Sequence, residues 1–239
     1  MADLTQRNPK WEHSLYSSGD AEKFIEAKYG SQMLEIYSRI DPAYGAARAD
    51  LLRHLIIYKL GGVYLDIKSD LRLPLDDVLR PDDQYILTQW RNGPGQSHEN
   101  LGLHPDLAHI SGGEFQSYLI MAVPGHPFSK ATIDGIVRNI IQYRPWSGVG
   151  QMGVLRTTGP IAYTLAVYPL LSTAPHRFTT ESDIGATMSI PNYAHNEVFR
   201  KHYSTLKVPV VRLSTLGRLT QICLERLRDF IHYIRSVKS

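Results

Sequence analysis

The stretch 47-ARADLLRHLIIYKLGGVYLDIKSD-70 decides the fold that this sequence predicts. Its first part has apolar residues at helical spacing, and Gly61-Gly62 follows as a helix end. The next run, VYLDI, is short, β-branched and aromatic, which is typical of a buried strand. Upstream, Asp41-Pro42 is expected to supply the N-cap and the first helical position. We therefore expect a helix that leads directly into a strand, with Asp66 at the strand's end.

Helical and strand patterns alternate along the rest of the chain. We expect further helices from an N-cap at Asp20 to Gly30, over 32–39, over 129–143, after Pro160 and over 215–238. We expect strands over 71–75, 85–90 and 115–123, and long loops over 91–113 and 144–159. This alternation predicts an α/β domain over residues 1–212 with a mixed or largely parallel sheet, followed by a basic amphipathic helix over 213–239.

Composition limits the class of protein. A chain of 239 residues that is 43% hydrophobic can bury a full core in one domain of ordinary size. Its one cysteine, Cys223, excludes an internal disulfide framework, so a cytoplasmic location is expected. The net charge of +3 is too small for a nucleic-acid-binding footprint. The sequence has no apolar run long enough to span a bilayer, and its polar start is not typical of a signal peptide.

The end of the predicted strand carries charged side chains at two-residue steps. If the strand continued regularly, Asp66, Lys68 and Asp70 would point to the same side, beyond the carboxyl end where ligands bind to open α/β sheets. Such a group can bind a phosphate together with Mg²⁺ or Mn²⁺, which prefer oxygen ligands. The alternative is structural: Asp66 caps a turn and Lys68 neutralises it.

A second charged pair lies on the preceding helix. Asp50 and Arg53 are three residues apart and therefore share a helix face. As a solvated pair they would contribute only about 0.3–0.5 kcal/mol. Their neighbours are mostly apolar, however, so we expect the pair to be partly buried and to have a functional role.

These segments together resemble glycosyltransferase family 32. The stretch ARADLLRHLIIYKLGGVYLDIK is similar to its DXD-containing sugar-binding region, and EFQSYLIMAVPGHPF, TTGPIAYTLAV and RKHY are similar to later motifs of the family. The glucosylating domains of large clostridial toxins are related at longer range. The resemblance covers roughly residues 9–203. It implies a GT-A-like fold, Rossmann-like with a mixed sheet flanked by helices, and transfer of a hexose from a nucleotide-sugar with retention of configuration.

The resemblance also implies roles for individual residues. Asp66 and Lys68 are expected to be catalytic at the diphosphate, and Asp66 and Asp70 are expected to ligate Mn²⁺ or Mg²⁺. Substrate-binding positions carried over from the family are Asp50, Arg53, Tyr64, Glu114, Gln116 and Gly159. A leaving diphosphate must be stabilised electrostatically, and either a metal or a fixed cation can do this.

Two departures from the family pattern affect this interpretation. Lys68 stands where the second aspartate of the DXD motif is expected, so it is a candidate counter-charge for the diphosphate. The apolar strand that normally precedes the NPKWE segment is not found ahead of it here, so two alternatives stay open: this sequence is truncated before the first strand of the GT-A-like fold, or another segment supplies the contact to the base. That strand lines the nucleotide pocket in the family, and the contacts to the base therefore stay open.

The expected partners are a nucleotide-sugar donor and a glycan or lipid-linked acceptor, with no nucleic acid. The basic amphipathic helix at the end of the chain either packs on the domain or contacts the membrane as a peripheral anchor. Two other functions are kept open: a non-catalytic module that binds nucleotide-sugars, and a metal-dependent phosphohydrolase that uses Asp66 and Asp70.

Overall fold

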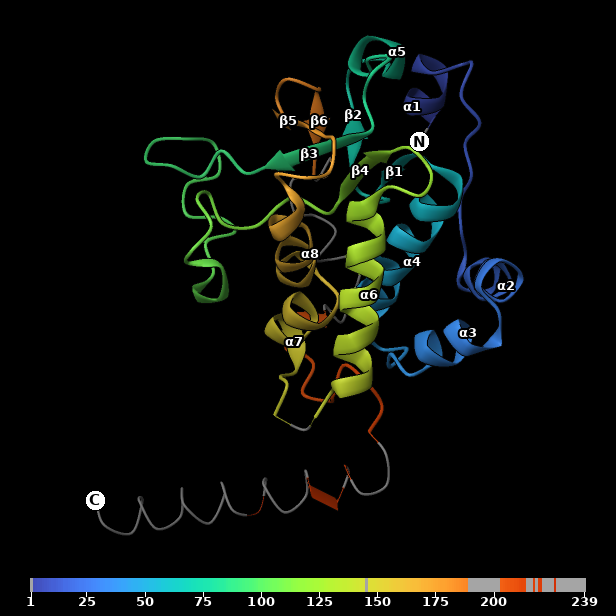
Figure 1. Cartoon of the computed structure of the whole chain (residues 1–239), viewed down its shortest axis with the longest axis vertical. Coiled ribbons are helices and arrows are strands. Elements are labelled where there is room, and N and C mark those ends of the chain that lie inside the picture. Colours follow the sequence, from blue (N-terminus) through green and yellow to red (C-terminus); the bar gives the residue numbers. More distant parts are fainter. Residues whose placement is uncertain are drawn as a thin grey trace.

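The computed structural model of the chain describes residues 2–144, 146–188 and 203–213, together with residues 217, 219, 220 and 226. In this part a mixed β-sheet lies between two layers of helices (Figure 1). Helices α4, α6 and α8 cover one face of the sheet, and α1 and α5 lie toward the other. Helices α2 and α3 pack against α4 and α6 at the side of the domain.

The elements have the following bounds. The α-helices are α1 (Ala2–Arg7), α2 (Ser18–Tyr29), α3 (Ser31–Ser38), α4 (Gly45–Leu60), α5 (Leu75–Val78), α6 (Pro127–Gln142), α7 (Gly150–Thr157) and α8 (Pro160–Val167). The strands are β1 (Gly62–Leu65), β2 (Asp70–Leu71), β3 (Tyr85–Gln89), β4 (Leu119–Ala122), β5 (Arg177–Thr180) and β6 (Ala186–Thr187). Short 3-10 helices are η1 (Pro105–Leu107), η2 (Tyr168–Leu170) and η3 (Tyr203–Thr205).

The main sheet has the strand order β1-β4-β3-β5. Strand β4 is antiparallel to both β1 and β3, and β5 is parallel to β3. Consequently β1, β3 and β5 all point the same way, and their carboxyl ends lie at one edge of the sheet together with the start of β4. Strands β2 and β6 form a separate two-stranded sheet.

Alternating side chains separate the two faces of the main sheet. Tyr64, Leu87 and Ile120 point toward the helices, where they join a core with residues of α4, α6 and α8. Val63 and Met121 point to the other face, into a core with residues of α5 and the N-terminal segment. The prediction of an α/β domain with a mixed sheet is therefore confirmed.

Helix α4 and strand β1 meet at the predicted glycine pair. Gly61 and Gly62 have φ angles of +67° and +95°, which side chains other than glycine rarely adopt. A Cβ on Gly61 would lie 2.6 Å from the ring of Pro124, which follows β4. The two glycines therefore allow a sharp reversal while the exits of α4 and β4 pack closely together.

Two expected helix starts are wrong by a few residues. Helix α2 begins after Ser17, whose side chain accepts a hydrogen bond from the Asp20 backbone while the Asp20 carboxylate accepts from Ser17, so Asp20 completes a capping box and is not the N-cap. Helix α4 begins after Tyr44, because Asp41 uses its carboxylate in a turn with the Ala43 backbone.

Several strand and loop expectations also need correction. Strand β1 is half-buried at the edge of the sheet and not fully buried. Of the strand expected over 71–75, only Leu71 is paired, together with Asp70 in β2, and Pro74 precedes helix α5. The expected loop over 144–159 contains α7, and η1 lies within the loop over 91–113. The helix expected over 215–238 lies almost entirely outside the described residues, as do Cys223 and His195.

Candidate functional site

The candidate site lies at the edge of the sheet where β1, β3 and β5 end and β4 begins. Asp66 follows β1, Trp90 follows β3, Glu181 follows β5, and Gln116 precedes β4. Ligands of open α/β sheets bind outside the carboxyl ends of the strands. The topology therefore places carboxylates from distant parts of the sequence at the edge where a ligand is expected.

Arg53 joins the helix and strand residues that the sequence singled out. Its guanidinium lies 2.9 Å from the Asp50 carboxylate and 3.1 Å from the Asp66 carboxylate, and it also donates to the backbone oxygen of Ser117. The Tyr64 hydroxyl donates to the same Asp66 oxygen at 2.9 Å, and the Tyr64 ring lies 4.9 Å from the guanidinium carbon. The solvated-pair alternative for Asp50 and Arg53 is therefore wrong, because both side chains are less than a tenth exposed.

Burial controls the electrostatics of this cluster. It raises the pKa of Asp50 from 3.8 to about 6, although Arg53 and a hydrogen bond from Thr158 favour the charged form. Burial likewise raises the pKa of Tyr64, so its hydroxyl stays a hydrogen-bond donor. Tyr203, in the RKHY segment, has a pKa raised to about 12 because it is buried and faces the carboxylates of Asp50 and Asp66. The cluster therefore brings three separate motifs into one place.

Thr158 and Gly159 hold the far side of Asp50. The Thr158 hydroxyl donates to the Asp50 carboxylate at 2.9 Å. A Cβ on Gly159 would lie 3.0 Å from the Cα of Leu155 and 3.5 Å from the Asp50 carboxylate, so the TGP turn packs directly against the cluster. His54, beside Arg53, is buried and neutral, since burial and Arg53 lower its pKa to about 3.

The expected alternation of Asp66, Lys68 and Asp70 on one side does not occur. Strand β1 ends at Leu65, and the chain turns at Ile67 and Lys68 before Asp70 enters β2. The Asp66 backbone carbonyl accepts from the Ser69 N–H at 2.8 Å, which closes this turn. Lys68 is half-buried on the turn and has no ion-pair partner among the described residues. Its ammonium group is therefore available to a ligand beside Asp66.

Asp70 is held by a different partner. The guanidinium of Arg7, at the end of α1, lies 2.5 Å from the Asp70 carboxylate, and Asp70 pairs with Thr187 across the second sheet. Asp66, in contrast, is only partly engaged. Arg53 and Tyr64 both contact the same carboxylate oxygen of Asp66, and the second oxygen has no protein partner in the described structure.

The described side chains do not fit a metal site built by the protein alone. Among residues 2–144, 146–188 and 203–213, no group of three or more His, Cys, Asp or Glu side chains is placed to hold a metal ion. Asp66 and Asp70 lie in different ion pairs. A divalent ion would thus find one free carboxylate oxygen here, and the expected metal role of the two residues stays a prediction.

A second buried network lies beside the first and was mostly missed in the sequence. The Glu114 carboxylate accepts from the Trp90 indole at 2.8 Å and pairs with His104, also at 2.8 Å. The Gln116 amide donates to Glu181 at 3.0 Å. Glu181 also pairs with His98. Both histidines come from the loop over 91–113, so this loop is anchored to the sheet edge by two carboxylates.

Sequence reasoning found Glu114 and Gln116 but not Glu181. Its signal is the same as that of Asp66, namely a carboxylate directly after a strand, but the strand RFTT was not recognised. The carbonyl oxygen of Gln116 is buried without a hydrogen-bond partner. Leaving such an acceptor unsatisfied costs about 1–3 kcal/mol, so it is a candidate acceptor for a ligand hydroxyl.

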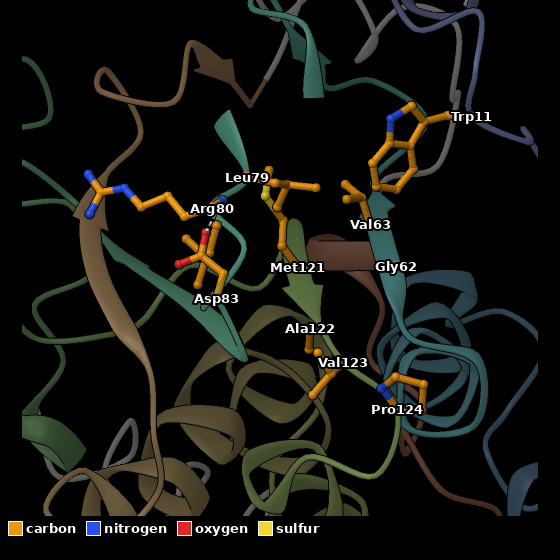
Figure 2. A pocket seen from close by; sticks show the side chains of 11 residues that line it. Trp11, Gly62, Val63, Leu79, Arg80, Asp83, Met121, Ala122, Val123 and Pro124 are labelled. Carbon is orange, nitrogen blue, oxygen red and sulfur yellow. Dashed lines mark hydrogen bonds between the residues drawn. The ribbon is translucent and has the colours of Figure 1, made fainter. Parts of the chain in front are cut away.

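The cavity in Figure 2 lies elsewhere. It has a volume of about 340 Å³ and is lined by residues at the opposite sheet edge, where β1 begins and β4 ends, with Trp11 above Val63. Two of its polar side chains are already engaged, because the Trp11 indole donates to Asp76 and Asp83 pairs with Arg177, and most of its other lining residues are apolar. We therefore assign the chemistry to the charged cluster and not to this cavity.

Comparisons with known proteins show what the chain is similar to. Residues 1–86 match the family described as "Glycosyltransferase sugar-binding region containing DXD motif". The chain is 26% identical to inositol phosphoceramide mannosyltransferase 3 of Schizosaccharomyces pombe over 64% of this chain and 35% of that protein. It is 25% identical to an initiation-specific alpha-1,6-mannosyltransferase of Candida albicans over 70% of this chain and 46% of that protein.

The chain thus spans less than half the length of these curated relatives. Among solved structures, a PaToxG glycosyltransferase matches with a TM-score of 0.43 and 17% identity, over 92% of this chain and 75% of that one. In the described part of the chain, no helix has the length and apolar character needed to cross a membrane.

Proposed function

We propose that this chain, which is similar in sequence to glycosyltransferases with a DXD sugar-binding region, transfers a hexose from a nucleotide-sugar to a glycan or lipid-linked acceptor. The observation that carries the proposal is the buried guanidinium of Arg53, which bridges Asp50 and Asp66. A buried charge of this kind is usually paired and hydrogen-bonded, and here it fixes two carboxylates at the ligand-binding edge of the sheet.

In this proposal Asp50 and Arg53 position the donor hexose. Their geometry is set from three sides by the helix, by Thr158 and by the backbone of Ser117. Such rigid placement supports orientation of a sugar, since a small displacement at a reacting centre costs much of the rate. Tyr64 keeps the Asp66 carboxylate in one position, so that its second oxygen faces the ligand.

The charge balance of the site supports a role for Lys68 at the diphosphate. Asp50, Arg53, Asp66 and Lys68 together carry no net charge when ionised. A diphosphate that approached Asp66 without Lys68 would meet a net negative cluster, and like charges at short range repel. The ammonium group of Lys68 therefore offsets this repulsion and stabilises the charge that develops on the leaving group.

A metal ion is proposed as an optional contributor. When bound, Mn²⁺ or Mg²⁺ would supply further positive charge at the diphosphate, and Asp66 would be its protein ligand. Retention of anomeric configuration and the relation of Glu114 and Gln116 to the sugar are likewise proposals from the resemblance.

The proposal is tested by isothermal titration of the full chain with UDP- and GDP-hexoses, with and without Mn²⁺. We expect one donor class to bind and Asp66→Asn to abolish its turnover while circular dichroism stays unchanged. Asp134→Asn, which alters an exposed carboxylate of α6, is the matched control. If no donor binds, or if Asp66→Asn retains full turnover, the proposal is wrong.

The same assays separate the two other functions. A non-catalytic nucleotide-sugar module would bind a donor without any transfer or donor hydrolysis. A phosphohydrolase would release phosphate from simple esters faster than it transfers sugar. The engagement of Asp70 by Arg7 speaks against a pair of metal-bound carboxylates for that chemistry.

A further inference from the structure

We propose that one end of the folded domain binds the surface of an anionic lipid bilayer. The contact surface, named here the Trp146 patch, consists of exposed apolar side chains with basic residues beside them: Trp146, Val149, Met152 and Val208, with Arg144 and Lys207. Trp146 is 69% exposed, which is unusual for a side chain of this size. The proposal does not depend on the sugar-transfer activity.

Two segments that are distant in sequence form the patch. Val149 pairs with Pro209 in an isolated β-bridge, which places Val208 beside the start of α7. Met152 lies in the first turn of α7, three residues after Val149, which is the N-cap of that helix. In Figure 1 the connection from α6 to α7 and the segment after η3 meet at the end of the domain that is remote from the sheet.

The residues on either side of Trp146 are joined by hydrogen bonds. The Arg144 N–H donates to the Ser147 hydroxyl, and the Ser147 N–H donates to the Arg144 carbonyl, both at 2.9 Å. Below the turn, the Tyr143 hydroxyl donates to the Gly148 carbonyl and accepts from the Val210 N–H. An exposed side chain on a pre-organised turn loses little backbone entropy on binding.

The two chain segments that form the patch carry basic but no acidic side chains, although Asp41 lies nearby, since its backbone N–H donates to the Val210 carbonyl. The segments 135–180 and 198–224 contain no aspartate or glutamate. Among the described residues, Arg144 and Lys207 form no ion pair, whereas Arg156, farther along α7, is neutralised by Asp106. The patch thus combines a protruding indole with unpaired cations, as interfacial membrane-binding surfaces do.

The same charge argues against a second copy of the chain as the occupant. A two-fold symmetric dimer would place identical patches face to face, so that Arg144 and Lys207 of one copy would lie near those of the other. Like charges in contact are unfavourable. An anionic bilayer instead supplies both the negative surface and the apolar interior.

The test is co-sedimentation of the full chain with lipid vesicles. We expect binding to phosphatidylcholine vesicles that contain phosphatidylserine, little binding to phosphatidylcholine alone, and loss of binding at high salt. Trp146→Ser should weaken binding about ten-fold. The double variant Arg144→Gln, Lys207→Gln should weaken it about 25-fold, since each base near an anionic surface contributes about five-fold. Leu165→Ser, on α8 and 43% exposed, is the matched control.

Three outcomes would overturn the proposal. They are equal binding to both kinds of vesicle, no binding by the unaltered chain, and binding that Trp146→Ser leaves unchanged. The last result would place the contact elsewhere in the chain, such as in residues 214–239. Because no donor is present in this assay, its result is independent of whether sugar transfer is found.

Discussion

Replacement of Asp50 by asparagine should flatten the pH dependence of stability. In the folded chain burial raises the pKa of Asp50 from 3.8 to about 6. The folded state therefore keeps this proton to higher pH than the unfolded state does. The stabilisation from the protonated group is fully present below pH 3.8 and is lost as the pH rises through about 6.

The magnitude follows from the size of this shift. A shift of one pKa unit corresponds to about 1.4 kcal/mol, so the complete loss amounts to about 3 kcal/mol. Between about pH 4.5 and pH 7, where only part of the titration takes place, the loss is about 2 kcal/mol. Asparagine at position 50 cannot ionise, so the Asp50→Asn chain should lack this part of the pH dependence.

The assay is urea unfolding followed by circular dichroism at both pH values. We compare the change in the free energy of unfolding between unaltered chain, Asp50→Asn and the control Asp134→Asn. The control should change like the unaltered chain. If the free energy of unfolding of the Asp50→Asn chain changes between the two pH values by the same amount as that of the unaltered chain, to within about 0.5 kcal/mol, the reasoning about burial is refuted. Thr158→Val provides a second measurement: it removes a bond to the charged carboxylate and should make the loss larger.

Three other predictions concern separate parts of the site. Lys68→Gln should lower kcat/KM for the donor about 10- to 100-fold, and the loss should be larger in EDTA than in Mn²⁺. If kcat/KM falls equally under both conditions, Lys68 does not supply charge at the diphosphate. Gly102→Ala should destabilise the chain by about 1–3 kcal/mol, measured as a lower Tm, since φ is +75° and a Cβ would lie 2.6 Å from Glu114 and 2.7 Å from Trp90. Glu181→Gln should lower the free energy of unfolding by about 1–3 kcal/mol, because the buried carboxylate would lose its charge-assisted hydrogen bonds with His98, Gln116 and Tyr118. An unchanged midpoint of urea unfolding would contradict this.

Local sequence patterns were enough to locate the part of the site around Arg53. Helical periodicity, a glycine pair and a carboxylate after a strand were enough to place Asp50, Arg53 and Asp66 near one another, because only a few residues separate α4 from β1. The second network, around Glu181, depends on which strands pair with one another in the sheet. Glu181 reaches Gln116 only because β5 lies beside β3 and β3 beside β4, and periodicity within one segment cannot predict that order.

Regular alternation failed where the backbone turned. The two-residue step from Asp66 to Asp70 predicted a shared side only for a continuing strand, but the turn at Lys68 sends Asp70 into another sheet. The partner of Asp70, Arg7, lies far away in the sequence, so this ion pair had no local signal. A turn of this kind is decided by tertiary contacts, such as the bond from the Ser69 hydroxyl to the Met188 carbonyl.

The sharp reversal at Gly61 also determines where the chain can tolerate changes of length. Arg53 contacts Asp66 across that reversal, and Pro124 packs against the place where Gly61 has no side chain. An inserted residue between them would rotate the helix by about 100° or exchange the two faces of the strand, and would separate the ion pair in either case. The loop over 91–113 runs on the other side of the site and is fastened at individual points, so lengthening it costs mainly closure entropy. Relatives of this chain should therefore differ in length within that loop and keep the spacing between Arg53 and Asp66.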